Sequence, residues 1–205
     1  QLPDPAELES ALEQVNYERV VLFDHGKRIL LENSGMRIDL GGIAKGYAAD
    51  EAAAVLEDLG HRRALINFGG NVVAIGNRPD GTLWRIGIQH PQRSRGETIG
   101  IVEVADATVV TSGKYERFFE VDGKRYHHIL DTDTGYPVEN GLASVTIVTD
   151  SSMKADALST AVFVIGLEAG LDLIKGFDGA EAVIITEDET VHVTEGIREK
   201  LVLID

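Results

Sequence analysis

Apolar residues recur with helical spacing in four stretches of the chain. Residues 5–15 begin with a proline suited to a first helical turn, and residues 43–59 stop just before Gly60, a residue typical of the position after a helix. Two apolar stretches with the same spacing follow in the last third of the chain. We therefore predict helices over residues 5–15, 43–59, 152–165 and 168–174.

Short apolar runs separated by turn residues predict strands. One hairpin is expected between residues 20–23 and 28–31, with Gly26 in its turn, and a closing hairpin between 182–186 and 190–193. Further strands are predicted at residues 64–68, 72–75, 84–88, 99–104, 109–111, 118–121 and 144–148. Strands that follow one another without helices between them form antiparallel meanders, so the pattern predicts an α+β fold of antiparallel sheets with packed helices.

Composition limits the classes of function. With 205 residues and 43% hydrophobic content, the chain can bury a core as one domain or as two small fused units. Its net charge of -15 would repel nucleic acid and anionic lipid, so we expect no nucleic-acid partner, and an anionic ligand would need a local cation. The absence of cysteine excludes disulfides and thiolate chemistry. No apolar run approaches the length of a membrane span.

Asp156 and Thr160 are four residues apart in a predicted helix, so their side chains share one helix face. A carboxylate and a hydroxyl oxygen are hard ligands of the kind that hold Mg²⁺ beside a phosphate. A solvated or locally bonded pair explains the same spacing.

Gly41, Gly42 and Lys45 stand where an extended segment enters the second helix. Backbone N–H groups at a helix N-terminus, close approach at glycine and a lysine charge together suit a phosphate. The alternative is a plain turn followed by a surface lysine, and neither common nucleotide-binding glycine signature is present.

Two further glycine turns, at Gly69-Gly70 and Ser112-Gly113, end predicted strands and can be either simple turns or places where a ligand approaches the backbone. His127 and His128 lie in an extended stretch and must point to opposite faces, so only one of them can serve a given site. A histidine at a loop edge can act as a general base, and a structural histidine is the alternative.

Five motifs, in order along the chain, resemble those of the FAD:protein FMN transferase family, also called ApbE. They are residues 38–47 (IDLGGIAKGY), 67–71 (NFGGN), 111–117 (TSGKYER), 127–135 (HHILDTDTG) and 155–161 (ADALSTA). The resemblance covers nearly the whole chain and implies a T-fold-related α+β architecture, with residues 1–205 forming one ApbE-like flavin transferase domain. It also implies a Mg²⁺-dependent enzyme that transfers FMN from FAD to a threonine hydroxyl of an acceptor protein and releases AMP.

The resemblance assigns roles residue by residue. Asp156 and Thr160 would supply oxygen ligands to Mg²⁺, together with the main-chain carbonyl of Ala44, and His128 would be the catalytic base. The FAD site would be lined by Asp39, Gly42, Lys45, Gly69, Gly70, Ser112 and Gly113. The resemblance further implies an exported protein, periplasmic or held at the membrane by a lipid anchor outside this chain.

Two departures from the family pattern bear on these expectations. Family members carry a further segment before the point that matches Gln1, including part of the flavin-binding wall, so we expect a domain that lacks an N-terminal segment and binds the flavin ring more weakly. Thr132 stands where the family usually has proline, which predicts a less rigid loop. Two other functions therefore stay open: an FAD pyrophosphatase that yields FMN and AMP, and a flavin-binding domain without turnover.

Overall fold

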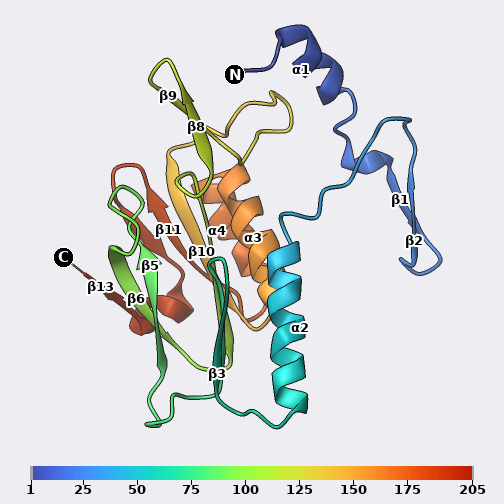
Figure 1. Cartoon of the computed structure of the whole chain (residues 1–205). Coiled ribbons are helices and arrows are strands. Elements are labelled where there is room, and N and C mark those ends of the chain that lie inside the picture. The colour runs from blue at the N-terminus through green and yellow to red at the C-terminus, as the bar shows by residue number, and fades with distance from the viewer. Residues whose placement is uncertain (1, 205) are drawn as a thin grey trace.

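The computed structural model describes residues 2–204 and has three layers (Figure 1). Three helices cover one face of a six-stranded sheet, and a three-stranded sheet covers its other face. The helices on the sheet are α2 (Ala44–Asp58), α3 (Ser152–Ile165) and α4 (Leu167–Lys175). A fourth helix, α1 (Pro5–Leu12), lies away from the sheet, and two short 3₁₀ turns are η1 (Tyr17–Arg19) and η2 (Glu195–Lys200). The layers confirm the predicted α+β class.

The six-stranded sheet has the order β12-β11-β10-β7-β4-β3, and every neighbouring pair is antiparallel. Its strands are β3 (Ala64–Phe68), β4 (Asn71–Ile75), β7 (Ala107–Gly113), β10 (Leu142–Thr149), β11 (Glu181–Thr186) and β12 (Val191–Val193). All eight residues of β10 are buried, because Val145 and Ile147 pack under the helices while Val148 packs against the second sheet. A strand covered on both faces is mostly apolar, and of the buried polar residues in β10, Thr146 bonds to Thr111 of β7 through their hydroxyls.

The three-stranded sheet has the order β13-β6-β5 and consists of β5 (Trp84–Gln89), β6 (Thr98–Val104) and β13 (Leu201–Leu203). Ile86, Ile88 and Val102 alternate with outward residues and form a core with Val183 and Ile185 of the larger sheet. The predicted continuous meander is wrong at this point. The strands β5 and β6, which follow β4 in the sequence, belong to the second sheet, and β4 pairs directly with β7.

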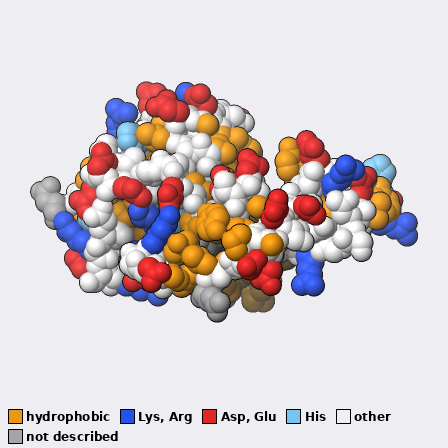
Figure 2. Space-filling model, turned by 90° about the horizontal axis from the view of Figure 1, so that it is seen from above, with side chains coloured by type: hydrophobic (Ala, Val, Ile, Leu, Met, Phe, Trp, Pro, Cys, Tyr) orange, Lys and Arg blue, Asp and Glu red, His pale blue; other side chains and the backbone are white. Residues whose placement is uncertain are grey.

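Two hairpins lie outside the layers: β1 (Val20–Phe23) with β2 (Arg28–Leu31), and β8 (Phe118–Val121) with β9 (Lys124–His127). The predicted Gly26 turn is confirmed, with φ 79° at that glycine. With α1, the first hairpin forms an arm that projects from the body (Figures 1 and 2), and Leu22, Ile29 and Leu30 are at least half exposed on it.

The predicted boundaries coincide with the structure or differ from it by one to three residues. The first helix ends at Leu12 and not at residue 15, because Gln14 and Val15 donate to the carbonyls three residues earlier and tighten the chain into turns. Two short strands were not predicted: β9, of which only an extended stretch at His127 was expected, and β13, although residues 201–204 form an apolar run. Within residues 2–204, no helix is long and apolar enough to cross a membrane.

Candidate active site

The site begins where α2 crosses α3. The backbone N–H of Gly46 donates to Asp156 Oδ2 at 3.0 Å, and a Cβ on Gly46 would lie only 2.2 Å from the carbonyl oxygen of Ser152. Only glycine therefore allows this approach. One turn further along α2, Asp50 accepts the N–H of Ser152 at 2.7 Å. The two helices thus run antiparallel, with Gly46 opposite Asp156 and Asp50 opposite Ser152.

This register bears on the predicted metal ligands. Asp156 is 4% exposed, and its Oδ2 satisfies one of the N–H groups in the first turn of α2 that have no partner within the helix. Thr160 lies one turn beyond Asp156 on α3. Ala44, two residues before Gly46, falls level with the interval between Asp156 and Thr160 when the same register is continued. The prediction that these three residues share one place on the molecule agrees with the packing of α2 on α3.

Ser112 joins the same place from the sheet. It lies near the end of β7, and its Oγ is 3.2 Å from Thr160 Oγ1 and 2.8 Å from Ser159 Oγ. Ser159 in turn donates to the carbonyl of Asp156 at 3.0 Å. The family resemblance implies Ser112 as part of the FAD site, and the structure brings its hydroxyl against Ser159 and Thr160 of α3.

The glycine turn between β3 and β4 lies beside the first turn of α2. Phe68 and Asn71 pair across it, and Gly69 and Gly70 have φ values of 59° and 102°, the left-handed pair of a two-residue hairpin. A Cβ on Gly69 would stand 4.0 Å from Cδ of Lys45, so the lysine stem passes over this turn. The structure therefore brings together the predicted Lys45 and the Gly69-Gly70 turn.

The loop that enters α2 is shaped by Asp39. Its Oδ1 accepts the N–H of Gly41 at 2.6 Å, which closes a small turn two residues long. Gly42 is exposed, and no atom lies within 4 Å of the position a Cβ would take. Asp39 thus acts locally on the loop, and the space beside Gly42 stays open to a ligand.

Gly113 has a packing role that the sequence did not indicate. A Cβ there would lie 2.6 Å from the ring of Tyr115, so glycine lets this ring lie against the end of β7. Burial raises the pKa of the Tyr115 hydroxyl, which stays protonated at neutral pH. The prediction that Gly113 lines the FAD site stays a prediction.

The two adjacent histidines differ as expected of opposite strand faces. His127 is 7% exposed, and its ring meets the ring of Phe163 edge-on. Its Nε2 donates to the carbonyl of Val138 at 3.2 Å, and its Nδ1 accepts the N–H of Ile129. Burial lowers the pKa of His127. His128 is exposed, and its Nδ1 donates to the carbonyl of Arg117 at 3.1 Å. In the neutral ring this leaves Nε2 of His128 as a free acceptor, which a general base requires.

The loop after His128 is held by Asp131. Its Oδ1 accepts the N–H groups of Asp133 and Thr134, and these two bonds lower the pKa of its carboxyl group. Gly135, at φ 71°, lies against Leu8 of α1, which ties the arm to this loop. Thr132 contributes no side-chain hydrogen bond within the described residues, so the turn forms without the proline typical of the family.

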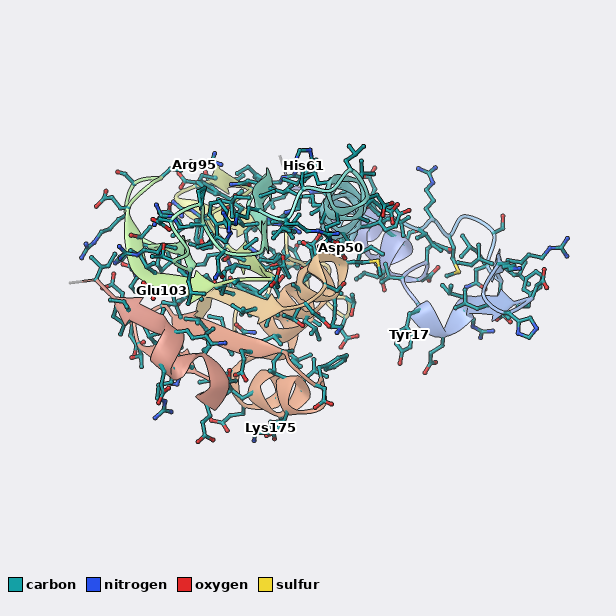
Figure 3. The ribbon with its side chains drawn as sticks, turned by 90° about the horizontal axis from the view of Figure 1, so that it is seen from below. Tyr17, Asp50, His61, Arg95, Glu103 and Lys175 are labelled. Atoms are coloured by element: carbon teal, nitrogen blue, oxygen red, sulfur yellow. The ribbon has the colours of Figure 1, made fainter. Side chains whose placement is uncertain are left out.

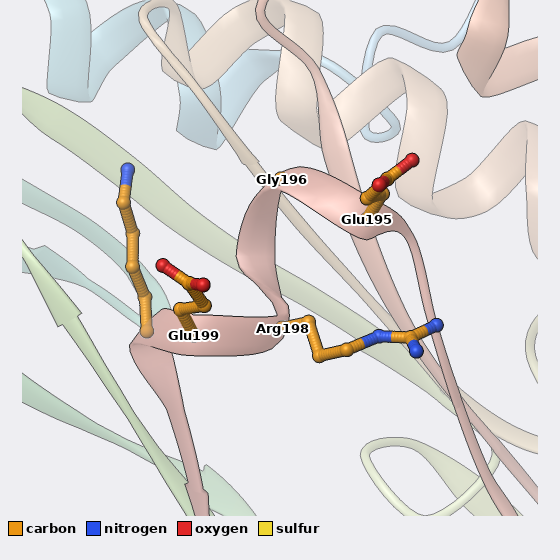
Figure 4. A pocket seen from close by; sticks show the side chains of 5 residues that line it. Glu195, Gly196, Arg198 and Glu199 are labelled. Atoms are coloured by element: carbon orange, nitrogen blue, oxygen red, sulfur yellow. The ribbon is translucent and has the colours of Figure 1, made fainter.

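No group of three His, Cys, Asp or Glu side chains capable of holding a metal occurs in residues 2–204. A site with one carboxylate suits Mg²⁺, which keeps several waters and takes few protein ligands, better than it suits zinc. A separate surface hollow on η2 is lined by residues 195, 196 and 198–200 (Figure 4), and none of the predicted site residues contributes to it.

Sequence reasoning missed Asp50 and the packing role of Gly46. A signal was present, because the two residues are four apart on the second predicted helix and therefore share a face. What they face depends on where α3 packs, which is a long-range feature.

The layered antiparallel α+β fold thus brings carboxylate and hydroxyl oxygens together where α3 packs on α2, beside a lysine and a glycine turn. Comparison with known proteins identifies the family. The ApbE family profile matches residues 1–184, and the chain belongs to the ApbE family.

Named relatives support the assignment. The FAD:protein FMN transferase of Treponema pallidum is 37% identical over 217 residues, covering 100% of this chain and 60% of that protein. The enzyme of the same name from Klebsiella pneumoniae is 37% identical over 190 residues, covering 93% of this chain and 58% of that protein. The chain therefore spans about three-fifths of the length of these relatives.

Solved structures give the same result. The ApbE protein of Thermotoga maritima superposes with a TM-score of 0.86 at 37% identity, covering 98% of this chain and 64% of that one. The flavin transferase ApbE of Vibrio cholerae superposes with a TM-score of 0.84 at 30% identity, covering 98% of this chain and 63% of that one.

Proposed function

We propose that this chain carries the active site of an FAD:protein FMN transferase. The observation that carries the proposal is the contact of Asp156 with the first turn of α2, which also bears Lys45 beside the Gly69-Gly70 turn, and the contact of Thr160, one turn further along α3, with Ser112. Family membership and the names of the relatives support it. FAD is the donor substrate, and the acceptor is the hydroxyl of a threonine on a partner protein.

The proposed reaction breaks the phosphoanhydride bond of FAD and forms a phosphoester bond to threonine. The threonine oxygen attacks the phosphorus on the FMN side of the FAD pyrophosphate, the bond from that phosphorus to the bridging oxygen breaks, and AMP leaves with that oxygen. The threonine proton passes to Nε2 of His128, whose other nitrogen is committed to the carbonyl of Arg117. General-base catalysis of this kind contributes roughly 10² to 10⁴ in rate.

The residues present fit a divalent cation. Asp156 Oδ2 accepts the N–H of Gly46, and Oδ1 would be the oxygen available to a metal. Asp156, Thr160 and the Ala44 carbonyl would hold Mg²⁺, which when bound neutralises charge on the pyrophosphate. Lys45 would bind a phosphate oxygen, and the surrounding glycines would admit the pyrophosphate close to the backbone.

Incubation with FAD and Mg²⁺ tests the proposal, with and without an unflavinylated protein known to carry FMN on threonine. The transferase yields AMP together with an acceptor whose mass rises by FMN less water. A pyrophosphatase yields AMP and free FMN whether or not the acceptor is present, and a binding domain yields neither. Either of these last two results would refute the proposed transfer.

The metal ligands are tested separately by calorimetry. Mg²⁺ is titrated into the wild type and Asp156→Ala, each saturated with FAD, and we expect the variant to lose measurable Mg²⁺ binding. Glu51→Gln, an exposed change of the same charge on α2, serves as the control. Equal affinity in the wild type and Asp156→Ala would remove Asp156 from the site.

A further inference from the structure

Asp50 of α2 holds the first turn of α3. Its Oδ1 accepts the N–H of Ser152 at 2.7 Å, and its Oδ2 accepts the N–H of Met153 at 3.0 Å and the hydroxyl of Ser151 at 2.9 Å. Figure 3 shows Asp50 where the two helices meet. All three bonds join residues about a hundred positions apart in the sequence.

These bonds complete the start of α3. The first N–H groups of a helix have no partner within it. Ser151 caps its own helix by accepting the N–H of Lys154, but the N–H groups of Ser152 and Met153 rely on the carboxylate supplied by the other helix. A carboxylate at a helix N-terminus is also favoured by the helix dipole. Asp50 therefore links α2 to α3 and also caps the N-terminus of α3.

The position of this bond matters for the site. Asp50 lies one turn after Gly46 on α2, and Ser152 lies one turn before Asp156 on α3. Two contacts, one turn apart, therefore fix the same antiparallel register of the helices: Asp50 with Ser152, and Gly46 with Asp156. Continued in the same direction, this register places Ala44 level with the interval between Asp156 and Thr160. A shift of α3 at the contact with Asp50 would therefore also move Asp156 and Thr160 relative to α2.

We propose that Asp50 is a positioning residue for the metal site: it fixes α3 against α2 so that Asp156, Thr160 and the Ala44 carbonyl converge on one cation. The inference rests on the proposed function, because it assumes the Mg²⁺ site formed by those residues. Asp50 itself touches neither metal nor substrate. Its effect passes through the helix register.

The first experiment measures Mg²⁺ affinity by calorimetry in the presence of FAD. Asp50→Asn places an amide N–H₂ against backbone N–H donors and should weaken Mg²⁺ binding by about 10- to 100-fold, the usual cost of losing a residue that orients metal ligands. Asp50→Glu keeps both acceptor oxygens on a longer arm and should recover part of the affinity. Fluorescence of Trp84, the single tryptophan, reports independently that the body remains folded, because it lies in the other sheet.

Two control variants separate positioning from other effects. Glu51→Gln makes the same charge change on the exposed side of α2. Ser151→Ala removes the Ser151 cap of α3 and the hydroxyl bond to Asp50, but leaves the two backbone bonds that fix α3 against Asp50. Both controls should keep the wild-type Mg²⁺ affinity. If Ser151→Ala weakens Mg²⁺ binding as much as Asp50→Asn, affinity follows the stability of the helix end, and the proposal is wrong.

A second experiment needs no variant. Coupling between two positions is reciprocal, so Mg²⁺ bound with FAD should slow hydrogen exchange at the Ser152 and Met153 amides more than at amides of α4. Unchanged exchange at these two amides, while Mg²⁺ binds normally, would overturn the role of Asp50. A wild-type chain that binds no Mg²⁺ at all would instead overturn the proposed metal site, and with it the present inference.

Discussion

His127 and His128 are neighbours in the chain, but the fold treats them differently. His127 has both ring nitrogens satisfied among buried groups, whereas His128 uses only Nδ1 and leaves Nε2 toward solvent. Strand alternation alone predicted that only one of them could serve a site. Which of the two is buried was not predictable from alternation, because it depends on the position of Phe163 and Val138, which belong to other elements.

We predict that His128→Asn lowers FMN transfer by at least about a hundredfold, the lower end for a lost general base, while FAD affinity changes little. His127→Asn should instead lower the free energy of unfolding, because a buried hydrogen bond and ring contact are lost. Initial rates of acceptor flavinylation and urea melts of both variants check this. A larger loss of rate per folded molecule in His127→Asn would reverse the assignment.

Burial of His127 also predicts a pH dependence of stability. Because its pKa is lowered in the folded chain from the ordinary 6.5, the unfolded chain binds a proton more readily. The contribution is thus fully present above pH 6.5 and is lost as pH falls from there toward the folded pKa. Urea melts between about pH 7.5 and 5 should show this fall in the wild type and a smaller one in His127→Gln. An equal pH dependence of the unfolding free energy in the two proteins would contradict the role of His127.

At the scale of elements, the pairing of α2 with α3 depends on Gly46. Gly46→Ala puts a Cβ 2.2 Å from the Ser152 carbonyl oxygen, so the helices must separate. We expect a loss of about 3 kcal/mol in unfolding free energy, the upper range for overpacking. Gly42→Ala, where a Cβ meets no atom within 4 Å, is the matched control and should change stability by less than about 1 kcal/mol. Equal losses in both variants would argue against the close approach.

The arm hairpin should be the least stable element. β1 and β2 pair only with each other, and Leu22, Ile29 and Leu30 remain exposed. An isolated two-stranded hairpin is marginally stable in water. Amide exchange of the 205-residue chain should therefore be fast at residues 20–31 and slowest in β10, which has neighbours on both edges and both faces. Protection of the hairpin equal to that of β10 would show that another surface holds it.

Local elements were largely predictable, and their long-range pairing was not. The Asp156–Thr160 face, the Gly69-Gly70 turn and the four helices follow from spacing and turn residues within a few positions of one another. The contact of Ser112 with Thr160 and the bond of Asp50 to α3 join distant segments. The sequence also did not indicate that β5 and β6, which lie between β4 and β7 along the chain, belong to a different sheet. The residue pattern of a strand does not specify which strand it pairs with.

At the scale of the whole molecule, charge sets how FAD arrives. The chain carries a net charge of -15, and the pyrophosphate of FAD is also anionic, so the long-range interaction is repulsive even though Lys45 is favourable at short range. Added salt screens the long-range repulsion first, since the Debye length falls from about 30 Å at 0.01 M to about 10 Å at 0.1 M.

The association rate of FAD should therefore rise a few-fold between about 20 and about 300 mM NaCl at constant Mg²⁺. Stopped-flow flavin fluorescence measures it, and riboflavin, which has the same ring without phosphates, is the matched ligand whose rate should not change. A rate for FAD that falls with salt would mean that the local cations, and not the net charge, dominate the approach. Lys45→Gln would then abolish the salt dependence, whereas under the expected behaviour it steepens the rise because the remaining field is more negative.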